Sequence, residues 1–219
     1  MKRATATASL SVSFTVGLYG IAFGAAGIAA GFSLLQTCAL SLLTFSGASQ
    51  FAVVGVMGAG GSAISAISTA SLLGIRNSLY GLRLAPLLKL RGLKRVVGAQ
   101  VTIDESTGVA LGQSDHGEDA MRQGFWLTGI GVYIFWNFFT VVGALGAQAM
   151  GDPAAWGLDA AVPAAFLGLV WPRLTNKRER TLAITAMVLS LALTPFVAAG
   201  IPIISTALLA LAFGWKARS

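Results

Sequence analysis

A stretch near the start of this chain, from Ala4 to Ile75, contains no Asp, Glu, Lys, Arg or His. Further uncharged runs cover 123–151, 160–172 and 181–215, and each is long enough, or nearly so, to cross a hydrocarbon core that takes about 20 helical residues. Hydrophobic residues make up 55% of the chain and the mean hydropathy is +0.76, outside the usual range of soluble domains. Polar and apolar residues do not alternate with a period of two, so helices are expected rather than a transmembrane barrel. The sequence therefore predicts an all-α membrane protein whose surroundings are the lipid bilayer.

The remaining charged and reactive residues exclude several classes of function. The formal net charge is +7, but the cations gather at the ends of apolar runs, which is typical of topology signals and does not indicate a nucleic-acid partner. The only cysteine, Cys38, lies in an apolar segment, and with the single His116 it cannot form a metal set. No nucleophile with a candidate base lies within the apolar spans, and the sequence has no phosphate-binding glycine loop. We therefore expect no enzyme activity, no metal and no cofactor.

The positions of lysine and arginine predict the orientation of the segments. Short cytoplasmic loops are enriched in these residues, so the basic clusters are expected inside and both termini cytoplasmic. The clusters are Lys2–Arg3, 83–95, 173–180 and Lys216–Arg218, whereas the connection 152–159 has no cation and is expected outside. Four apolar segments of the second half cross alternately in agreement with this assignment: 123–150, 157–172, 181–197 and 201–215.

The first half of the chain does not fit the same rule so easily. Three apolar segments, 10–31, 33–57 and 62–82, separate two basic clusters that both belong inside, and three crossings would put those clusters on opposite sides. Segment 33–57 is the best candidate for one that fails to cross. Its stretch TFSGASQ (44–50) could turn the chain back at membrane depth, which gives a re-entrant hairpin that opens outward. A continuous helix whose polar side chains bond to neighbouring helices is the alternative.

These observations predict one transmembrane domain over 1–219. We expect a polytopic helical bundle with about six to seven membrane segments, one of them re-entrant or broken. Its first half covers 10–82, an amphipathic and polar cytoplasmic connection covers 84–122, and its second half covers 123–216.

Small residues recur on one face of the first segment. Glycines follow one another at intervals of three and four residues, and a serine extends the series, so all six positions share one helical face. In lipid, such a face lets two helices approach backbone to backbone. The alternative is that this face of small residues moves against a neighbouring helix or lines a substrate path. The positions are Ser13, Gly17, Gly20, Gly24, Gly27 and Gly31.

Arg76 is the first charged residue after Arg3 and lies within the third apolar segment. A charge inside a span is a functional hypothesis with a partner to be named. Arg76 would bind a substrate or protein carboxylate, with Asn77 and Tyr80 beside it, or its side chain would extend to the cytoplasmic surface. Asp104 is a candidate partner for Arg76 or a proton-coupling carboxylate, and an ordinary role at a helix start is the alternative.

The stretch TFSGASQ supplies the other candidate binding groups. A zwitterionic amino acid needs donors for its carboxylate, acceptors for its ammonium and an apolar pocket for its side chain. Ser46, Gly47, Ser49 and Gln50 could supply these groups, together with backbone amides freed by a break in the helix.

A polar residue in the second half, Asn137, is a further candidate for the substrate site. It shares a helical face with Tyr133 and Thr140. Buried asparagine in a membrane helix usually bonds to another helix, so interhelical hydrogen bonding is the alternative to lining a site.

Four sequence motifs together resemble the AzlC family of bacterial inner-membrane proteins. They are GLYGIAFG, FSGASQFA, RNSLYGLRLAPLL and TIDESTGVAL, and their order and spacing make the likeness fairly specific over about the first 110 residues. The chain departs from the family pattern at two positions beside the arginine. Where a form such as NLRHLLYG has Asn and His, this sequence has Gly74 and Asn77.

The resemblance implies that the chain exports branched-chain or similar hydrophobic amino acids across the bacterial inner membrane. It also implies a small hydrophobic companion subunit of the AzlD type, which would form a heteromer with this chain. Because no phosphate-binding motif is present, we expect an ion gradient to drive transport. A channel or a structural subunit of a membrane complex is the alternative.

Overall fold

The computed structural model describes residues 2–151, 155, 160–171 and 174–215. All regular elements in these ranges are helices, as predicted. Most of the expected outer connection 152–159, and the cations Arg173, Lys216 and Arg218, lie outside the described residues. The helices are α1 (Lys2–Gly17), α2 (Tyr19–Ala29), α3 (Leu34–Leu43), α4 (Gly47–Gly58), α5 (Ala63–Leu88), α6 (Leu93–Gln100), α7 (Asp104–Gly112), η1 (Ser114–His116), α8 (Glu118–Ala149), α9 (Ala161–Val170), α10 (Lys177–Leu193) and α11 (Ile201–Trp215).

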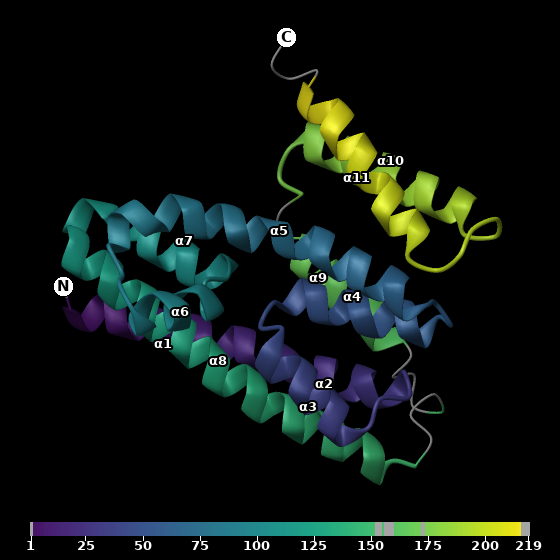
Figure 1. Ribbon diagram of the computed structural model, residues 1–219, viewed down its shortest axis with the longest axis horizontal. Helices are drawn as coiled ribbons and strands as arrows, with labels where there is room; N and C mark the ends of the chain where they lie inside the picture. The colour runs from purple at the N-terminus through teal and green to yellow at the C-terminus, as the bar shows by residue number, and fades with distance from the viewer. Residues whose placement is uncertain (1, 152–154, 156–159, 172–173, 216–219) are drawn as a thin grey trace.

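The long helix α8 packs along α1 and α2, as Figure 1 shows. α1 and α2 follow one another as a nearly continuous helix, because Leu18 between them keeps helical dihedral angles. Among the described residues, two helices are long and apolar enough to cross a membrane, namely Arg3–Ala29 and Glu118–Ala149. The helices Leu34–Leu43, Gly47–Gly58 and Ile201–Gly214 are apolar but shorter. An all-helical membrane architecture is therefore supported, and the count of six to seven membrane segments stays a prediction.

The glycine face of the first segment is a packing surface. A Cβ atom added at Gly20 would overlap the Trp136 carbonyl oxygen, and one added at Gly24 would overlap the Thr140 carbonyl oxygen. Residues later in α2 contact residues later in α8, so α1–α2 and α8 run parallel, and their backbones are in contact. Gly31 is the exception, because its φ of +86° places it in the turn after α2.

Segment 33–57 contains the expected break, and the continuous-helix alternative is wrong. α3 ends at Leu43 and α4 begins at Gly47. The chain reverses at this break, since a Cβ atom added at Gly58 would lie 3.1 Å from Cβ of Ala30, close to where α3 begins. α3 and α4 therefore form a hairpin whose open end lies at the C-terminal end of α2. We call it hairpin 1.

The region 84–122, expected as a polar connection, has more order than its composition suggested. α6 and α7 form a second hairpin, called hairpin 2, with its tip at 101–103. Ser106 holds this tip: its hydroxyl donates to the Val101 carbonyl at 2.7 Å and accepts from the Ile103 amide at 3.0 Å. The side chain of Ser106 is fully buried. Hydrogen bonding of this kind allows a sharp break inside a packed protein.

The two hairpins enter from opposite ends of α8 and meet near its middle. The tip of hairpin 2 contacts α8 where a Cβ atom added at Gly129 would lie 2.9 Å from Val101, and hairpin 1 contacts it where Gly47 faces Trp136. The Gln100 side chain at the end of α6 donates to the Leu42 carbonyl at the end of α3, at 3.0 Å. The tips are therefore joined directly.

The order of elements is repeated with opposite orientation. α1–α2 precedes hairpin 1, and α5 precedes hairpin 2. α5 begins near the end of α2 and ends beside the start of α8, where Lys89 pairs with Glu118 at 2.7 Å. α5 therefore runs in the direction opposite to α1–α2. When Thr44 is aligned with Thr102, α3 falls on α6 and α4 on α7 to within a few residues. The tip sequences TFSGASQFA and TIDESTGVA then share small and hydroxyl residues at matching positions. Inverted repeats with broken helices are a common construction of secondary transporters.

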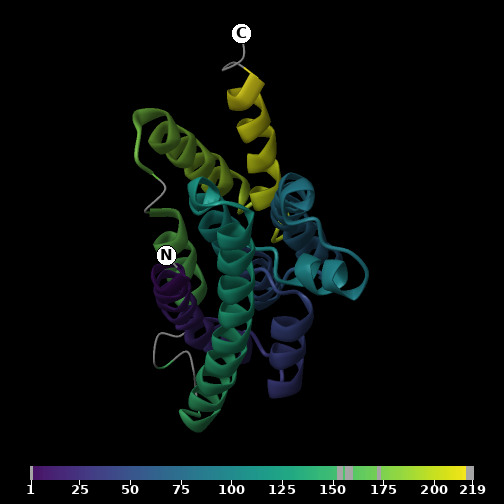
Figure 2. The same ribbon diagram turned by 90° about the vertical axis from the view of Figure 1, so that its left-hand side faces the viewer.

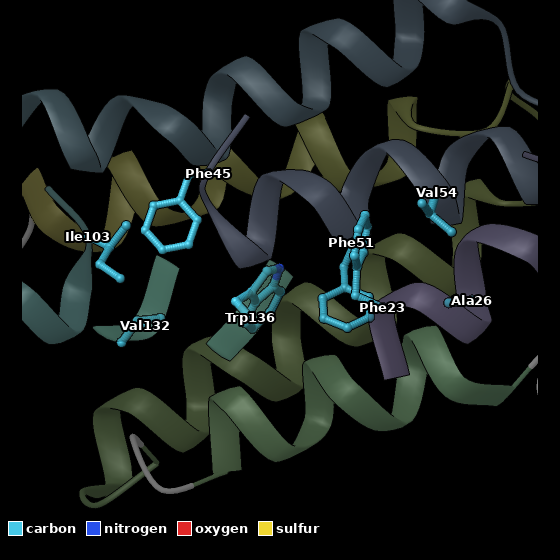
Figure 3. Packing of buried hydrophobic residues seen from close by; sticks show 8 residues of the cluster. All are labelled: Phe23, Ala26, Phe45, Phe51, Val54, Ile103, Val132 and Trp136. Atoms are coloured by element: carbon cyan, nitrogen blue, oxygen red, sulfur yellow. The ribbon is translucent and has the colours of Figure 1, made fainter. Parts of the chain in front are cut away.

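The main apolar core lies along the hairpin tips and centres on Trp136 (Figure 3). Phe23 and Phe51 contact Trp136 on one side, with ring centroids 6.3 Å away in each case. Phe45 and Ile103, one from each hairpin tip, lie on the other side. This core fixes the positions at which α4 and α7 begin.

The last helices lie at one edge of the protein, as Figure 2 shows for α10 and α11. α11 packs on α10 and on α5. The turn before α11 contacts the turn before α5, because a Cβ atom added at Gly61 would lie 3.1 Å from Cβ of Ala199. The positive-inside rule assigns both turns to the outer face, so this contact agrees with that assignment.

Candidate functional site

A cavity of about 200 Å³ lies where the two hairpin tips face α5 and α8. It is smaller than pockets for drug-sized ligands, which take about 300–1,000 Å³, and its size suits a small solute. Apolar residues and a few polar groups share its wall, as is usual for binding sites. The lining residues are Val16, Phe45, Ser46, Gly47, Ala48, Leu73, Arg76, Asn77, Ile103, Asp104, Glu105, Val132, Trp136 and Val170.

Two helix N-termini open onto this cavity. α4 begins at Gly47 after the extended residue Ser46, and α7 begins at Asp104 after the extended residue Ile103. Free backbone N–H groups at such ends carry partial positive charge. α7 compensates this charge with acidic residues in its first turn, whereas the first turn of α4 holds only Gly47 and other uncharged residues. The N-terminus of α4 is therefore available to an anionic group.

An ion pair links α5 to hairpin 2 at the cavity wall. Arg76 Nη1 lies 3.1 Å from Asp104 Oδ2, and the two side chains keep 34% and 14% of their surface exposed. Asp104 was expected either to pair with Arg76 or to stand at a helix start. In the structure it does both. The arginine reaches a protein carboxylate, which is the contact that the first hypothesis predicted. Asp104 is largely buried and Arg76 is half-buried, so removing either group would leave the other with less compensation for its charge.

Two buried polar atoms on the α5 side of the lining have no hydrogen-bond partner among the described residues. They are Nε of Arg76, a donor, and Oδ1 of Asn77, an acceptor. Buried polar groups are nearly always hydrogen-bonded, and an exception at a cavity calls for an explanation. The residue that lacks an acceptor and the residue that lacks a donor therefore line the same small cavity.

Comparison with known proteins identifies the family. The profile described as AzlC protein matches residues 11–150, well over half of the chain. The chain belongs to the AzlC family. It is similar to Inner membrane protein YgaZ of Escherichia coli (strain K12), with 29% identity over 172 residues that cover 75% of this chain and 69% of YgaZ. No solved structure matches the chain significantly. Membership of the AzlC family and this relative support a membrane protein with a role in transport.

Five of the residues proposed from the sequence line the cavity of this AzlC protein. They are Ser46, Gly47, Arg76, Asn77 and Asp104. They come from hairpin 1, α5 and hairpin 2, which are far apart in the sequence. The fold therefore brings together groups that the sequence predicted only as separate candidates.

Ser49 and Gln50 of the AzlC chain lie behind the cavity wall. Ser49 donates to the Ala70 carbonyl at 2.9 Å and so ties α4 to α5. Gln50 is fully buried, donates to the Ser41 carbonyl at 3.2 Å and accepts from Trp136 Nε1 at 2.8 Å. These contacts position hairpin 1 on α8. Neither residue is among those that line the 200 Å³ cavity.

Tyr80 and Asn137 also lie outside the cavity lining. Tyr80 is half-buried, one helical turn beyond Arg76 on α5. Asn137 donates to the Tyr133 carbonyl of its own helix at 2.8 Å. Its neighbours make the interhelical bonds instead: Tyr133 donates to the Leu42 carbonyl, and the Thr140 hydroxyl lies 3.3 Å from that of Ser41.

Sequence reasoning did not place several lining residues at the site, above all Trp136, Ile103 and Glu105. The indole N–H of Trp136 donates to Gln50, and the indole ring forms part of the cavity wall. A signal was present in the sequence, because Ile103 follows Thr102 as Phe45 follows Thr44. Aligning the two hairpin tips would have put both breaks at one site.

A second, wider cavity of about 600 Å³ adjoins the first. Phe45, Ser46 and Asn77 line both spaces, so the tip of hairpin 1 and one turn of α5 form the partition. Ser49 lines the second cavity only. A solute that moves from one space to the other would pass this partition.

Proposed function

We propose that this AzlC-family protein is a secondary transporter that exports branched-chain or similar hydrophobic amino acids across the bacterial inner membrane. An ion gradient would drive the export, and the protein would not be an enzyme. The observation that carries the proposal is the small cavity at the meeting point of two broken hairpins, with Arg76 and Asp104 in its wall. Broken helices present backbone groups at substrate sites in transporters of this construction.

The chemistry of the cavity fits a small molecule with polar and apolar parts. Arg76 and the N-terminus of α4 provide groups for a carboxylate, and Phe45, Ile103 and Val132 provide apolar walls. The two hairpins open toward opposite ends of α8, so a movement of one hairpin against the other would expose the cavity alternately to the two faces. We propose that the partition between the cavities moves during this step.

The function also depends on the placement in the membrane, which we propose as follows. Hairpin 1 is re-entrant and opens outward, six segments cross, and both termini are cytoplasmic. Single cysteines at positions 5, 60, 90 and 155 would test this placement with an impermeant thiol reagent, after Cys38→Ser. We expect labelling from outside only at 60 and 155, because the basic cluster near 90 and the N-terminal cations belong inside. Labelling of position 90 from outside would contradict the placement.

Transport in reconstituted vesicles tests the function itself. We expect leucine and valine flux that saturates, that favours one enantiomer and that responds to an imposed ion gradient, because a carrier binds its substrate in a small shaped site. The assay is done with and without a small hydrophobic subunit of the AzlD type, which we propose as the partner in a heteromer. Vesicles without protein give the background.

The two alternatives predict different results in the same assay. Flux that does not saturate and does not distinguish enantiomers would indicate a channel. A complete lack of flux, with and without the small subunit, would indicate a structural subunit. Either result would overturn the proposal.

A further inference from the structure

We propose that the Arg76–Asp104 ion pair is divided by the substrate. The carboxylate of a zwitterion would replace Asp104 at Arg76, and its ammonium group would take Asp104 and the Asn77 carbonyl oxygen as partners. This inference rests on the proposed function and goes beyond it, since it assigns each end of the substrate to named residues. It also states why the cavity would select zwitterions over molecules with a net charge.

The charges at the cavity wall favour a ligand that is itself a zwitterion. The wall holds one guanidinium and two carboxylates, and the guanidinium of Arg76 pairs with the carboxylate of Asp104 at 3.1 Å, so this pair is locally neutral. A zwitterion also has no net charge, and it can supply one opposite charge to each member of the pair. Exchange of one ion pair for two then leaves no buried charge uncompensated. An anion would compensate only the charge of Arg76, and a cation would compensate only the charge of Asp104.

The two unpartnered atoms on α5 also fit a zwitterion. In the described part of the chain, Arg76 Nε lacks an acceptor and Asn77 Oδ1 lacks a donor. An α-carboxylate accepts hydrogen bonds and an ammonium group donates three, so one α-amino acid supplies both missing partners. Both residues line the same cavity of about 200 Å³, which limits the ligand to a small molecule.

The N-terminus of α4 fixes the direction of the substrate. Ser46, Gly47 and Ala48 line the cavity at the start of this helix, whose partial positive charge favours a carboxylate. At the start of α7 the acidic residues Asp104 and Glu105 line the wall and favour an ammonium group. The carboxylate is therefore directed toward hairpin 1 and the ammonium toward hairpin 2.

Binding to purified protein tests the inference with three ligands that share the isobutyl side chain of leucine. These are leucine, its 2-oxo acid, which lacks the ammonium, and 3-methylbutylamine, which lacks the carboxylate. The parent protein should bind leucine at least about tenfold more tightly than either analogue, since each analogue leaves one charge unpaired. Calorimetry reports these affinities without any need for transport.

Two variants should change this preference in opposite directions. In Asp104→Asn the ammonium loses its partner, so leucine should bind about tenfold more weakly and the 2-oxo acid should become the preferred ligand. In Arg76→Gln the carboxylate loses its partner, and the amine should become preferred. Asp115→Asn makes the same chemical change on the exposed turn η1 and should keep the preference of the parent.

Each possible result decides between the inference and the function on which it rests. Leucine affinity in Asp104→Asn equal to that of the parent would overturn the inference alone. An equal loss of all three ligands in both variants, with the folded state retained in circular dichroism, would also overturn it. A parent protein that binds none of the ligands would overturn the proposed function as well.

Discussion

Replacing Arg76 with lysine is expected to abolish most transport while the protein still reaches the membrane. Lysine keeps the positive charge but lacks the planar fork, and it has no donor at the position of the buried Nε. Loss of one hydrogen bond to a charged group costs about 1.5–3 kcal/mol, which corresponds to a loss of roughly 10- to 100-fold in affinity. Leucine flux in vesicles with equal amounts of parent and variant protein measures the effect.

A matched control separates the role of Arg76 from a general requirement for arginine on α5. Arg83 lies on the same helix and is exposed, so Arg83→Lys should leave flux unchanged. Full activity in both Arg76→Lys and Arg76→Gln would show that the Arg76–Asp104 pair is a structural contact and that the substrate binds elsewhere.

Replacing Gly24 with valine is expected to prevent stable packing of the central helices. A Cβ atom at this position would overlap the Thr140 carbonyl oxygen and lie 2.7 Å from the Ala144 nitrogen. Both neighbours are backbone atoms of α8, so relief requires that the helices separate, and overpacking of this kind costs about 1–3 kcal/mol. We expect the upper end of that range, seen as a lower midpoint of thermal unfolding in detergent and a lower yield from membranes.

Gly146→Val is the control for this experiment. Gly146 also lies on α8, and a Cβ atom there would meet no other atom within 4 Å among the described residues. The two variants therefore add the same volume at a glycine within a helix, and only one of them affects a contact between helices. Thermal unfolding of Gly24→Val at the same midpoint as Gly146→Val would contradict a backbone-to-backbone contact between α2 and α8.

The sequence by itself determined the class of the protein and the positions of most helices. A run without charges from Ala4 to Ile75 restricts the chain to helices in an apolar solvent, because unpaired backbone groups are costly there. The spacing of Gly17, Gly20 and Gly24 determined the packing face of α1–α2, since helical periodicity alone puts small residues on one side. Charge parity between basic clusters made segment 33–57 the best candidate for one that fails to cross, and its stretch TFSGASQ does contain a break, between α3 and α4.

Only the tertiary structure decided which of the nominated groups share a site. Gln50 and Ser49 stand beside Ser46 in the sequence, but their hydrogen bonds direct them to α8 and α5 and away from the cavity. Arg76 and Asp104 are separated by the second half of α5 and all of α6, and the reversal of hairpin 2 brings them to 3.1 Å. The physical reason is that periodicity and charge act along one helix, whereas a site depends on where separate helices end against each other, which only the packing of the hairpin tips on Trp136 fixes.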